Sequence, residues 1–236
     1  MPGRLPEIIA HRGTPREHPE NSLPGFLRAV EYGVDGIELD VHVTRDGVPV
    51  VHHDAALRPR GSPLDGECIA DLTLAELAGY ELAHGVGVPT LAEAIALAAG
   101  RTRVYVEVKA RDAADVVVPG LRGRGDATPV HSFDHRVSRR THELDPSLPV
   151  GVLSVSYLVD NVAQMRSAGA RDLWQMWAMI DRPLVEEVHA AGGRVIAWTV
   201  NDPAAAVALA RLGVDGLCTD VPDVVGPAVA RALGGA

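Results

Sequence analysis

Short apolar segments alternate with longer amphipathic ones along the whole chain. The short runs of Val, Ile, Leu and Ala predict strands that are buried on both faces. The segments between them have apolar residues three and four positions apart, which predicts helices that each cover one side of a sheet. We predict strands of such strand–helix units that end at His11, Asp40, Lys109, Phe133, Leu153, Met176, Val200 and Thr219.

The helices between these strands are predicted at 21–33, 90–99, 113–121, 137–144, 158–167, 183–191, 203–212 and 224–233. Eight parallel strands that alternate with helices over 236 residues predict a (β/α)8 TIM barrel, and we expect residues 1–236 to form a single domain. An open doubly wound sheet is the rival architecture. Its first turn is usually glycine-rich, and His11-Arg12-Gly13-Thr14 is not such a turn.

One stretch departs from the regular order. At the strand period of two, Glu38 and Asp40 project from the same face of their strand. Residues 45–47 read as a tight turn, and residues 48–51 as a second strand of a hairpin that brings His53 back beside the carboxylates. The following segment 55–88 is irregular, with one short helix at 72–77. We expect the whole segment 55–88 to be a small insertion after the second barrel strand, over the barrel mouth.

Composition fits such a barrel and narrows the possible partners. Apolar residues make up 47% of the chain and aromatic residues only 4%, so the core is expected to consist mainly of aliphatic side chains. The formal charge is −9, from 22 basic and 31 acidic residues. A general nucleic-acid binder needs a basic face, so we expect no nucleic-acid partner and a local cluster of cations for any phosphate.

Features that report on cellular compartment are few. Cys68 and Cys218 have no metal-binding or redox spacing and are expected to be free thiols. No apolar run approaches the roughly 20 residues of a membrane span, and no apolar signal-peptide segment follows residues 1–4. We expect a cytoplasmic protein without stable membrane insertion, and the oligomeric state stays open.

The ends of the predicted strands carry the candidate chemistry, because the C-terminal strand ends of a (β/α)8 barrel meet at one mouth. Three carboxylates would crowd there, those of Glu38, Asp40 and Glu107. They repel one another unless a cation neutralises them. Oxygen ligands without cysteine favour Mg or Ca over zinc, so the sequence predicts a divalent metal ion of that kind.

The same mouth would hold two cations and two histidines. Arg12 and Lys109 indicate an anionic substrate, and the planar guanidinium suits phosphate. His11 and His53 come from different segments, and two histidines separated by a bound phosphate can act as general acid and general base. These residues predict cleavage of a phosphate ester.

Sequence motifs in one order through nearly the whole chain point to a family. They are His11-Arg12-Gly13, Pro19-Glu20-Asn21-Ser22, 35–41, 46–51, His53-Asp54, 71–73, 88–91, Glu107-Val108-Lys109, Ser132-Phe133, 198–202, 213–216 and 219–223. In these motifs the chain resembles the glycerophosphodiester phosphodiesterase family of the phosphatidylinositol-phospholipase-C-like TIM barrels.

The resemblance implies a metal-dependent enzyme that hydrolyses glycerophosphodiesters to glycerol 3-phosphate and an alcohol. Glu38, Asp40 and Glu107 would bind the metal, and His11 and His53 would be the acid/base pair. In the family's scheme the neighbouring glycerol hydroxyl attacks phosphorus first, and a cyclic phosphate is then hydrolysed. Direct attack by water ends in the same products.

The resemblance also implies that Arg12 and Lys109 contact the phosphate of a small-molecule substrate. Trp198 fits two roles, barrel filler or a wall for the glycerol or alcohol moiety. We assign the mouth to His53 rather than His52, because alternation lets only one of them face it and His53 precedes Asp54. Whether His131, Glu20 or Asn21 contributes stays open.

Two other functions compete with this one. A lysophospholipase-D-type enzyme acting on monoacyl lipids would need an apolar trough beside the mouth, and the short, aromatic-poor insertion gives no sign of one. A non-catalytic barrel that binds organic phosphates would have no use for an acid/base pair. The alcohol headgroup, the choice between Mg and Ca, and the pathway stay open.

Overall fold

The computed structural model describes residues 5–57, 66–83 and 85–234, and its centre is a closed barrel of parallel strands. The first strand pairs with both the second and the last, which closes the sheet and confirms the predicted TIM barrel. The barrel strands are β1 (Glu7–His11), β2 (Gly36–Val43), β6 (Arg103–Val108), β7 (Val130–Ser132), β8 (Val150–Ser154), β9 (Asp172–Met176), β10 (Arg194–Trp198) and β11 (Gly216–Thr219).

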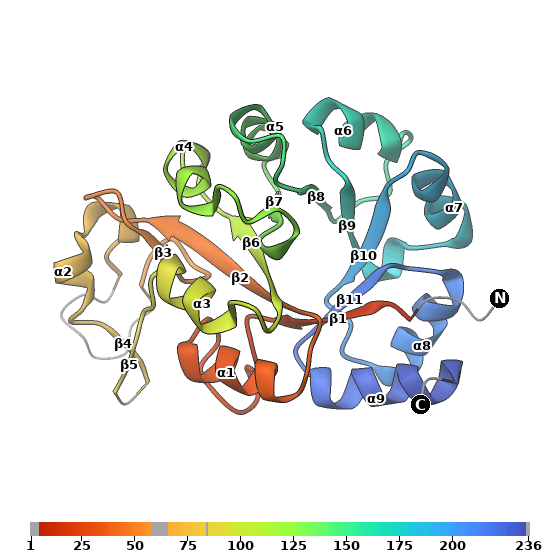
Figure 1. Ribbon diagram of the computed structural model, residues 1–236, viewed down its shortest axis with the longest axis horizontal. Coiled ribbons are helices and arrows are strands. Elements are labelled where there is room, and N and C mark those ends of the chain that lie inside the picture. The colour runs from red at the N-terminus through yellow and green to blue at the C-terminus, as the bar shows by residue number, and fades with distance from the viewer. Residues whose placement is uncertain (1–4, 58–65, 84, 235–236) are drawn as a thin grey trace.

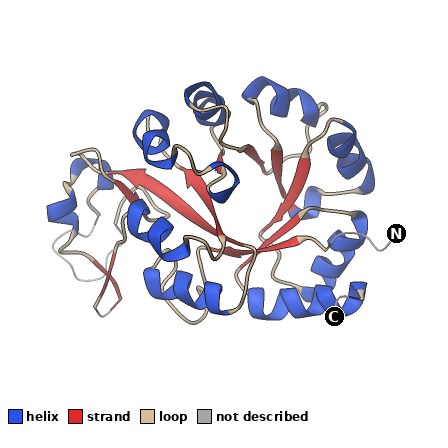
Figure 2. Cartoon of the chain, viewed as in Figure 1, coloured by secondary structure: helices blue, strands red, loops and turns tan. Residues whose placement is uncertain are grey.

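Helices surround the strands as an outer layer (Figures 1 and 2). They are α1 (Leu23–Glu31), α3 (Leu91–Ala98), α4 (Ala114–Val117), α5 (His135–Leu144), α6 (Asn161–Ala168), α7 (Arg182–Ala190), α8 (Pro203–Leu212) and α9 (Pro222–Leu233). Short 3-10 turns lie at η1 (Ile69–Asp71), η2 (Val118–Leu121), η3 (Gly125–Ala127) and η4 (Trp177–Met179). None of the helices in the described ranges has the length and apolar character that a bilayer crossing requires.

Local sequence explains where the helices begin and end. Ser22 caps α1 through its side chain, and Thr90 with Glu93 forms a capping box at the start of α3. The single helix predicted at 113–121 is wrong. It is a four-residue α4 that continues as the 3-10 turn η2, because Pro119 has no N–H and its ring clashes with the preceding turn of an α-helix.

Side chains of β2 show how the alternating pattern builds two cores. Ile37, Leu39 and Val41 point outward and are buried in the large cluster that packs against the helices. Inside the barrel, bulky rings need space that glycines provide. A Cβ at Gly36 would lie 2.6 Å from the ring of Tyr105, and one at Gly151 would lie 2.9 Å from the ring of Trp174. The barrel interior is therefore filled with side chains and is not a pore.

The N-terminal end of the barrel is closed by a buried charged group. Glu7 accepts hydrogen bonds from Arg103, at 2.7 Å, and from the hydroxyl of Tyr105, at 2.6 Å, and it forms a 3.0 Å ion pair with Arg194. Burial acts to raise the pKa of Glu7, but the hydrogen bond from Tyr105 and the charges of the two arginines outweigh it, so this pKa is lowered. We expect this network to stabilise the barrel away from the mouth.

The predicted hairpin is confirmed. Strand β3 (Pro49–Val51) pairs antiparallel with β2, with Val41 opposite Val51, and Gly47 adopts the positive φ of +81° that the turn requires. The amide of His52 donates to the carbonyl of Asp40 at 3.0 Å, so the same register continues beyond β3. The residues after β3 are thereby placed beside the carboxylate end of β2.

The described part of the insertion packs beyond this hairpin, at the left of Figure 1. It contains α2 (Leu74–Leu77) and a small hairpin of β4 (Glu81–Ala83) and β5 (Val86–Gly87), around a core of its own that includes Leu77 and Tyr80. The β4–β5 hairpin was not predicted, because two- and three-residue strands are too short to show a period. Residues 1–4, 58–65, 84 and 235–236, which belong to the predicted domain 1–236 and in part to the predicted insertion 55–88, lie outside the described residues.

Candidate active site

The polar residues predicted at the strand ends come together at the C-terminal end of the barrel. They line a cavity of about 220 Å³ together with apolar side chains from the opposite strands. The predicted site residues among its lining are His11, Arg12, Glu38, His53, Glu107, Lys109 and Trp198. Asp40 lies beneath them and is fully buried. It does not line the cavity but forms ion pairs with Arg12 and Lys109, which do.

His11 is held by a chain of hydrogen bonds from the end of β11. Its Nδ1 lies 2.6 Å from Oδ1 of Asp220, and the other Asp220 oxygen accepts from the side-chain amide of Asn201 at 2.6 Å. Burial acts to raise the pKa of Asp220, but the bond with His11 outweighs it and lowers this pKa. An ionised carboxylate only accepts, so Nδ1 of His11 carries the hydrogen, and the neutral ring leaves Nε2 free for chemistry in the cavity.

The charge state of His11 follows from the same contacts. Burial acts to lower its pKa, but the hydrogen bond to Asp220 and the charge of Glu38, whose carboxylate is 3.9 Å from Nε2, outweigh burial, so the pKa is raised. A histidine poised in this way can donate or accept a proton near neutral pH.

His53 and His52 have different surroundings. Nδ1 of His53 lies 2.7 Å from Oδ1 of Asp54, and the ring lines the cavity. Nδ1 of His52 lies 2.8 Å from the backbone oxygen of Asp54, and its ring packs edge-on against Tyr80 of the insertion. Nε2 of His42 lies 3.1 Å from the carbonyl oxygen of His53 and so supports the backbone there.

Asp40 is neutralised by cations in this structure. Lys109 Nζ lies 2.8 Å from one of its oxygens, and Arg12 Nε lies 3.0 Å from the other. Burial acts to raise the pKa of Asp40, but Lys109 and Arg12 outweigh it, so the pKa is lowered. Asn21 also donates a hydrogen bond to Asp40 at 2.8 Å, and Glu20 accepts one from Arg12 at 3.1 Å. These two residues therefore help to hold the Asp40 carboxylate and the Arg12 guanidinium in place.

The first loop holds two residues in a left-handed backbone conformation. Arg12 has φ of +54° and Asn21 has φ of +57°, values that residues with a Cβ adopt at a cost of about 1–3 kcal/mol. Hydrogen bonds fix both, since the amide of Arg12 donates to the carbonyl of Glu38 at 2.9 Å and that of Asn21 donates to the carbonyl of Arg12 at 3.0 Å. The strained loop thereby directs the guanidinium toward Asp40 and the cavity.

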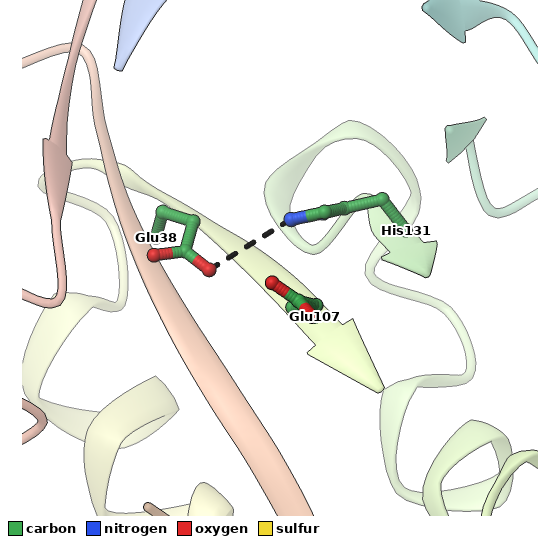
Figure 3. A group of neighbouring side chains, drawn as sticks. All are labelled: Glu38, Glu107 and His131. Carbon is green, nitrogen blue, oxygen red and sulfur yellow. Dashed lines mark ion pairs between the residues drawn. The ribbon is translucent and has the colours of Figure 1, made fainter. Parts of the chain in front are cut away.

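A group of three buried side chains is suited to a metal ion. One ligand atom each of Glu38, Glu107 and His131 lies within 4.8 Å of the others, and Figure 3 shows the carboxylates facing the imidazole. Nε2 of His131 is 3.8 Å from Glu38, and its ring stacks on Trp174. Burial, and then the charge of Asp40, raises the pKa of Glu107, which is the expected result of carboxylates crowded without enough positive charge.

A barrel of this kind, with paired histidines, cations and clustered carboxylates in one cavity at its mouth, defines an enzyme class suited to phosphate esters. The model of the glycerophosphoryl diester phosphodiesterase family matches residues 11–224. The chain therefore belongs to this family of hydrolases, and the resemblance inferred from its motifs is confirmed.

Relatives from several organisms match over most of their length. The chain is 31% identical over 237 aligned residues to a glycerophosphodiester phosphodiesterase of Caldanaerobacter subterraneus subsp. tengcongensis, a match that covers 92% of this chain and 95% of the relative. It is 29% identical to one of Bacillus altitudinis, over 93% of this chain and 96% of the relative. A solved phosphodiesterase of Oleispira antarctica, in complex with the product sn-glycerol-3-phosphate, has a TM-score of 0.86 at 27% identity, over 95% of this chain and 97% of that one.

Sequence reasoning missed the two residues that orient His11. Asp220 follows β11 directly, and a polar residue at the C-terminal end of a barrel strand is itself a signal for the mouth. Asn201 lies in the loop after β10, and its contact with Asp220 depends on two loops meeting, so periodicity cannot reveal it. His131, left open on sequence, lines the cavity and joins the carboxylate group.

Proposed function

We propose that the protein is a metal-dependent glycerophosphodiester phosphodiesterase that releases glycerol 3-phosphate and an alcohol. The observation that carries this proposal is the position of His11 and His53 on one small cavity that also contains Arg12 and Lys109. Acid/base groups and phosphate-binding cations at the same place are what hydrolysis of a phosphodiester requires. The relative that was solved with sn-glycerol-3-phosphate supports the same substrate class.

Arg12 and Lys109 would bind the phosphate in this mechanism. Each already neutralises a buried carboxylate, and each side chain still reaches the cavity. Trp198, whose ring lies edge-on to Phe133 at 5.3 Å, would form a wall for the carbon skeleton next to the phosphate. Held in this way, the scissile bond lies between the two histidines, which saves the entropy of bringing acid, base and ester together.

His11 and His53 would divide the proton transfers. We assign His11 as the base, because its Nδ1 hydrogen is committed to Asp220 and its Nε2 can take the proton of the attacking hydroxyl. The new P–O bond would form as the bond to the alcohol breaks: water as the nucleophile gives glycerol 3-phosphate directly, whereas the neighbouring glycerol hydroxyl gives a cyclic phosphate that a water molecule then opens. His53, on the hairpin beside the mouth, would then give a proton to the departing alkoxide, which is too basic to leave without one.

A divalent cation of the Mg or Ca type fits this site. We propose Glu38, Asp40 and Glu107 as its ligands, and His131 as a neighbour close enough to complete the set. Two features of the described residues support the fit: the Glu38, Glu107 and His131 group, and the single ammonium of Lys109, which lies within 2.8 Å of Asp40 and 2.6 Å of Glu107. When bound, the cation would supply positive charge that stabilises the phosphate as negative charge builds up.

The test is a coupled assay for glycerol 3-phosphate over a panel of glycerophosphodiesters, with and without EDTA and with Mg²⁺ or Ca²⁺ added back. We expect turnover that EDTA abolishes and one of the two cations restores. The variants Asp40→Asn and His131→Asn, compared for the cation concentration at half-maximal rate, separate a ligand from a neighbour. Full turnover by thoroughly chelated enzyme would contradict the metal assignment.

The remaining assignments rest on the sequence. A small-molecule phosphodiester is the proposed partner, and the charge of −9 argues against nucleic acid. A cytoplasmic location stays a prediction.

A further inference from the structure

One imidazole in the cavity lacks the hydrogen bond that usually orients a histidine near a metal ion. His131 is 1% exposed, and its Nδ1 is buried without a hydrogen-bond partner among the described residues. Its Nε2 lies 3.8 Å from Glu38, which is too far for a hydrogen bond. Metal-binding histidines almost always donate the hydrogen of their second nitrogen to a carboxylate, a carbonyl or water. A contact of another kind therefore has to hold this ring.

The ring of Trp174 provides that contact. The two rings are stacked, with 4.1 Å between their centroids and 7° between their planes. His131 belongs to β7 and Trp174 to β9, and Gly151 belongs to β8, which lies between these two strands. A Cβ on Gly151 would lie 2.9 Å from Cδ1 of Trp174 and 3.1 Å from Cβ of His131. The missing side chain of this glycine therefore lets both rings approach each other.

Trp174 is itself fixed from the closed end of the barrel. The ring of Tyr105 lies edge-on to it, with 5.3 Å between the centroids, and the hydroxyl of Tyr105 donates to Glu7 at 2.6 Å. Tyr105, Trp174 and His131 thus form a column of buried rings that runs inside the barrel from the Glu7 network to the mouth. Close-packed interiors leave such side chains little freedom to move, so the column holds the last ring of the three in one plane.

The stack fixes the plane of the imidazole, and the carboxylates select its orientation within that plane. A nitrogen of His131 and one oxygen each of Glu38 and Glu107 lie within 4.8 Å of one another, and Figure 3 shows the nitrogen facing the carboxylates. A half-turn about the Cβ–Cγ bond would keep the stack but put a carbon atom in the place of Nε2, and carbon does not bind a cation. The ring therefore offers a nitrogen to the cation site only while both its plane and its orientation are held.

We propose that Trp174 is a positioning residue of the cation site, which holds the His131 imidazole so that its Nε2 contributes to cation binding beside Glu38 and Glu107. This inference rests on the proposed function, because the cation is part of that mechanism. Trp174 acts through His131 and takes no part in the proton transfers. Its loss is therefore felt in the affinity for the cation and not in kcat at a saturating cation concentration.

The experiment measures the Kd of Mg²⁺ and of Ca²⁺ by isothermal titration calorimetry, which needs no turnover. Loss of a group that orients a metal-binding histidine typically weakens metal binding 10- to 100-fold, so Trp174→Leu should raise Kd by about tenfold. Trp174→Phe keeps an aromatic ring against the imidazole and should stay within about threefold of wild type. Trp177→Leu is the matched control, because Trp177 follows β9 in the chain but is 40% exposed. It should leave Kd unchanged.

A double-mutant cycle separates positioning from a general loss of structure. In a His131→Asn background, Trp174→Leu should change Kd by less than about twofold, because the ring that Trp174 holds is no longer there. At a saturating cation concentration, Trp174→Leu should keep kcat within about threefold of wild type.

Tryptophan fluorescence reports on the same contact without disturbing it. The chain has three tryptophans, so Trp177→Phe combined with Trp198→Phe leaves Trp174 as the only emitting indole. Titration with the cation should change its emission with the Kd found by calorimetry, because a charge then lies beside the stacked imidazole. His131→Asn should abolish this change. If thermal unfolding shows that Trp174→Leu does not fold, the fluorescence titration decides.

The outcomes separate the possible failures. Equal Kd values for wild type and Trp174→Leu, or an emission that does not respond to a bound cation, would overturn the inference and leave the proposed function intact. The same loss of affinity from Trp174→Leu with and without His131 would show a merely structural effect and would also overturn it. A wild-type protein that binds neither cation would contradict the metal dependence in the proposed function itself.

Discussion

Asp220→Asn replaces one carboxylate oxygen by an NH2 group, and the surrounding hydrogen bonds decide which way the new side-chain amide is oriented. Asn201 is fixed by its own carbonyl, which accepts from the backbone amide of Asp220 at 2.9 Å and from the hydroxyl of Thr219 at 3.1 Å. Its amide therefore has to point at residue 220 as a donor. The substituted side chain must offer its one oxygen to Asn201 and its amide hydrogens to His11.

The expected loss of activity follows from this orientation. His11 would have to accept at Nδ1 and carry its hydrogen at Nε2, so the neutral ring would present no base to the cavity. A lost hydrogen bond to a charged group costs about 1.5–3 kcal/mol, or roughly 10- to 150-fold. Loss of general base catalysis costs on the order of 10² to 10⁴. We expect the larger effect to dominate, with kcat down by at least about 10² and KM within about threefold.

The double variant Asp220→Asn with Asn201→Asp is the matched control. It exchanges the amide and the carboxylate, so the oxygen of residue 220 can face His11 again and restore the original tautomer, although without the charge. Steady-state kinetics should show at least about tenfold recovery of kcat over Asp220→Asn, while thermal unfolding checks that all the variants fold. An Asp220→Asn enzyme within threefold of wild type, or a double variant without recovery, would refute the reasoning.

Three further predictions concern the histidines and the closed end of the barrel. His53→Ala should lower kcat by on the order of 10² to 10⁴, whereas His52→Ala should stay within about tenfold of wild type, and equal losses would mean that the wrong histidine is assigned. His53→Ala should lower the rate of hydrolysis of an alkyl glycerophosphodiester at least about tenfold more than that of a p-nitrophenyl phosphodiester, because nitrophenolate leaves without a proton. His11→Ala should lower both rates by the same factor. The same ratio of the two losses in both variants would exclude divided roles. The pKa of Glu7 is lowered in the folded state, so its stabilisation is present above the unfolded value near 4.5 and is lost as pH falls through the lower folded value. Urea unfolding from about pH 3 to about pH 7 should therefore show a weaker acid dependence in Glu7→Gln, and an unchanged dependence would contradict the network.

Most of the fold could be predicted from the sequence, because each barrel strand is a short apolar run with a helix behind it. The hairpin was also predictable, since Glu38 and Asp40 alternate with Leu39 and a Gly47 turn follows. The errors fall where the period is too short to read. They are the four-residue helix interrupted before Pro119 and the small hairpin of the insertion.

The candidate site was predictable only as far as strand ends could place it. His11, Glu38 and Glu107 meet at the mouth because parallel strands bring their ends together. The pairing of His11 with Asp220 depends on side-chain direction in the loops, and the lysine shared by Asp40 and Glu107 depends on rotamers that no sequence pattern specifies.

The most direct test of the central claim is the identity of the products of glycerophosphocholine, followed by phosphorus NMR with the wild-type enzyme and a divalent cation. We predict that the phosphodiester signal is replaced by that of glycerol 3-phosphate, with choline released in equal amount, and that a variant lacking both His11 and His53 leaves the substrate unchanged. Phosphocholine and free glycerol as products, or no conversion under any cation, would contradict the account.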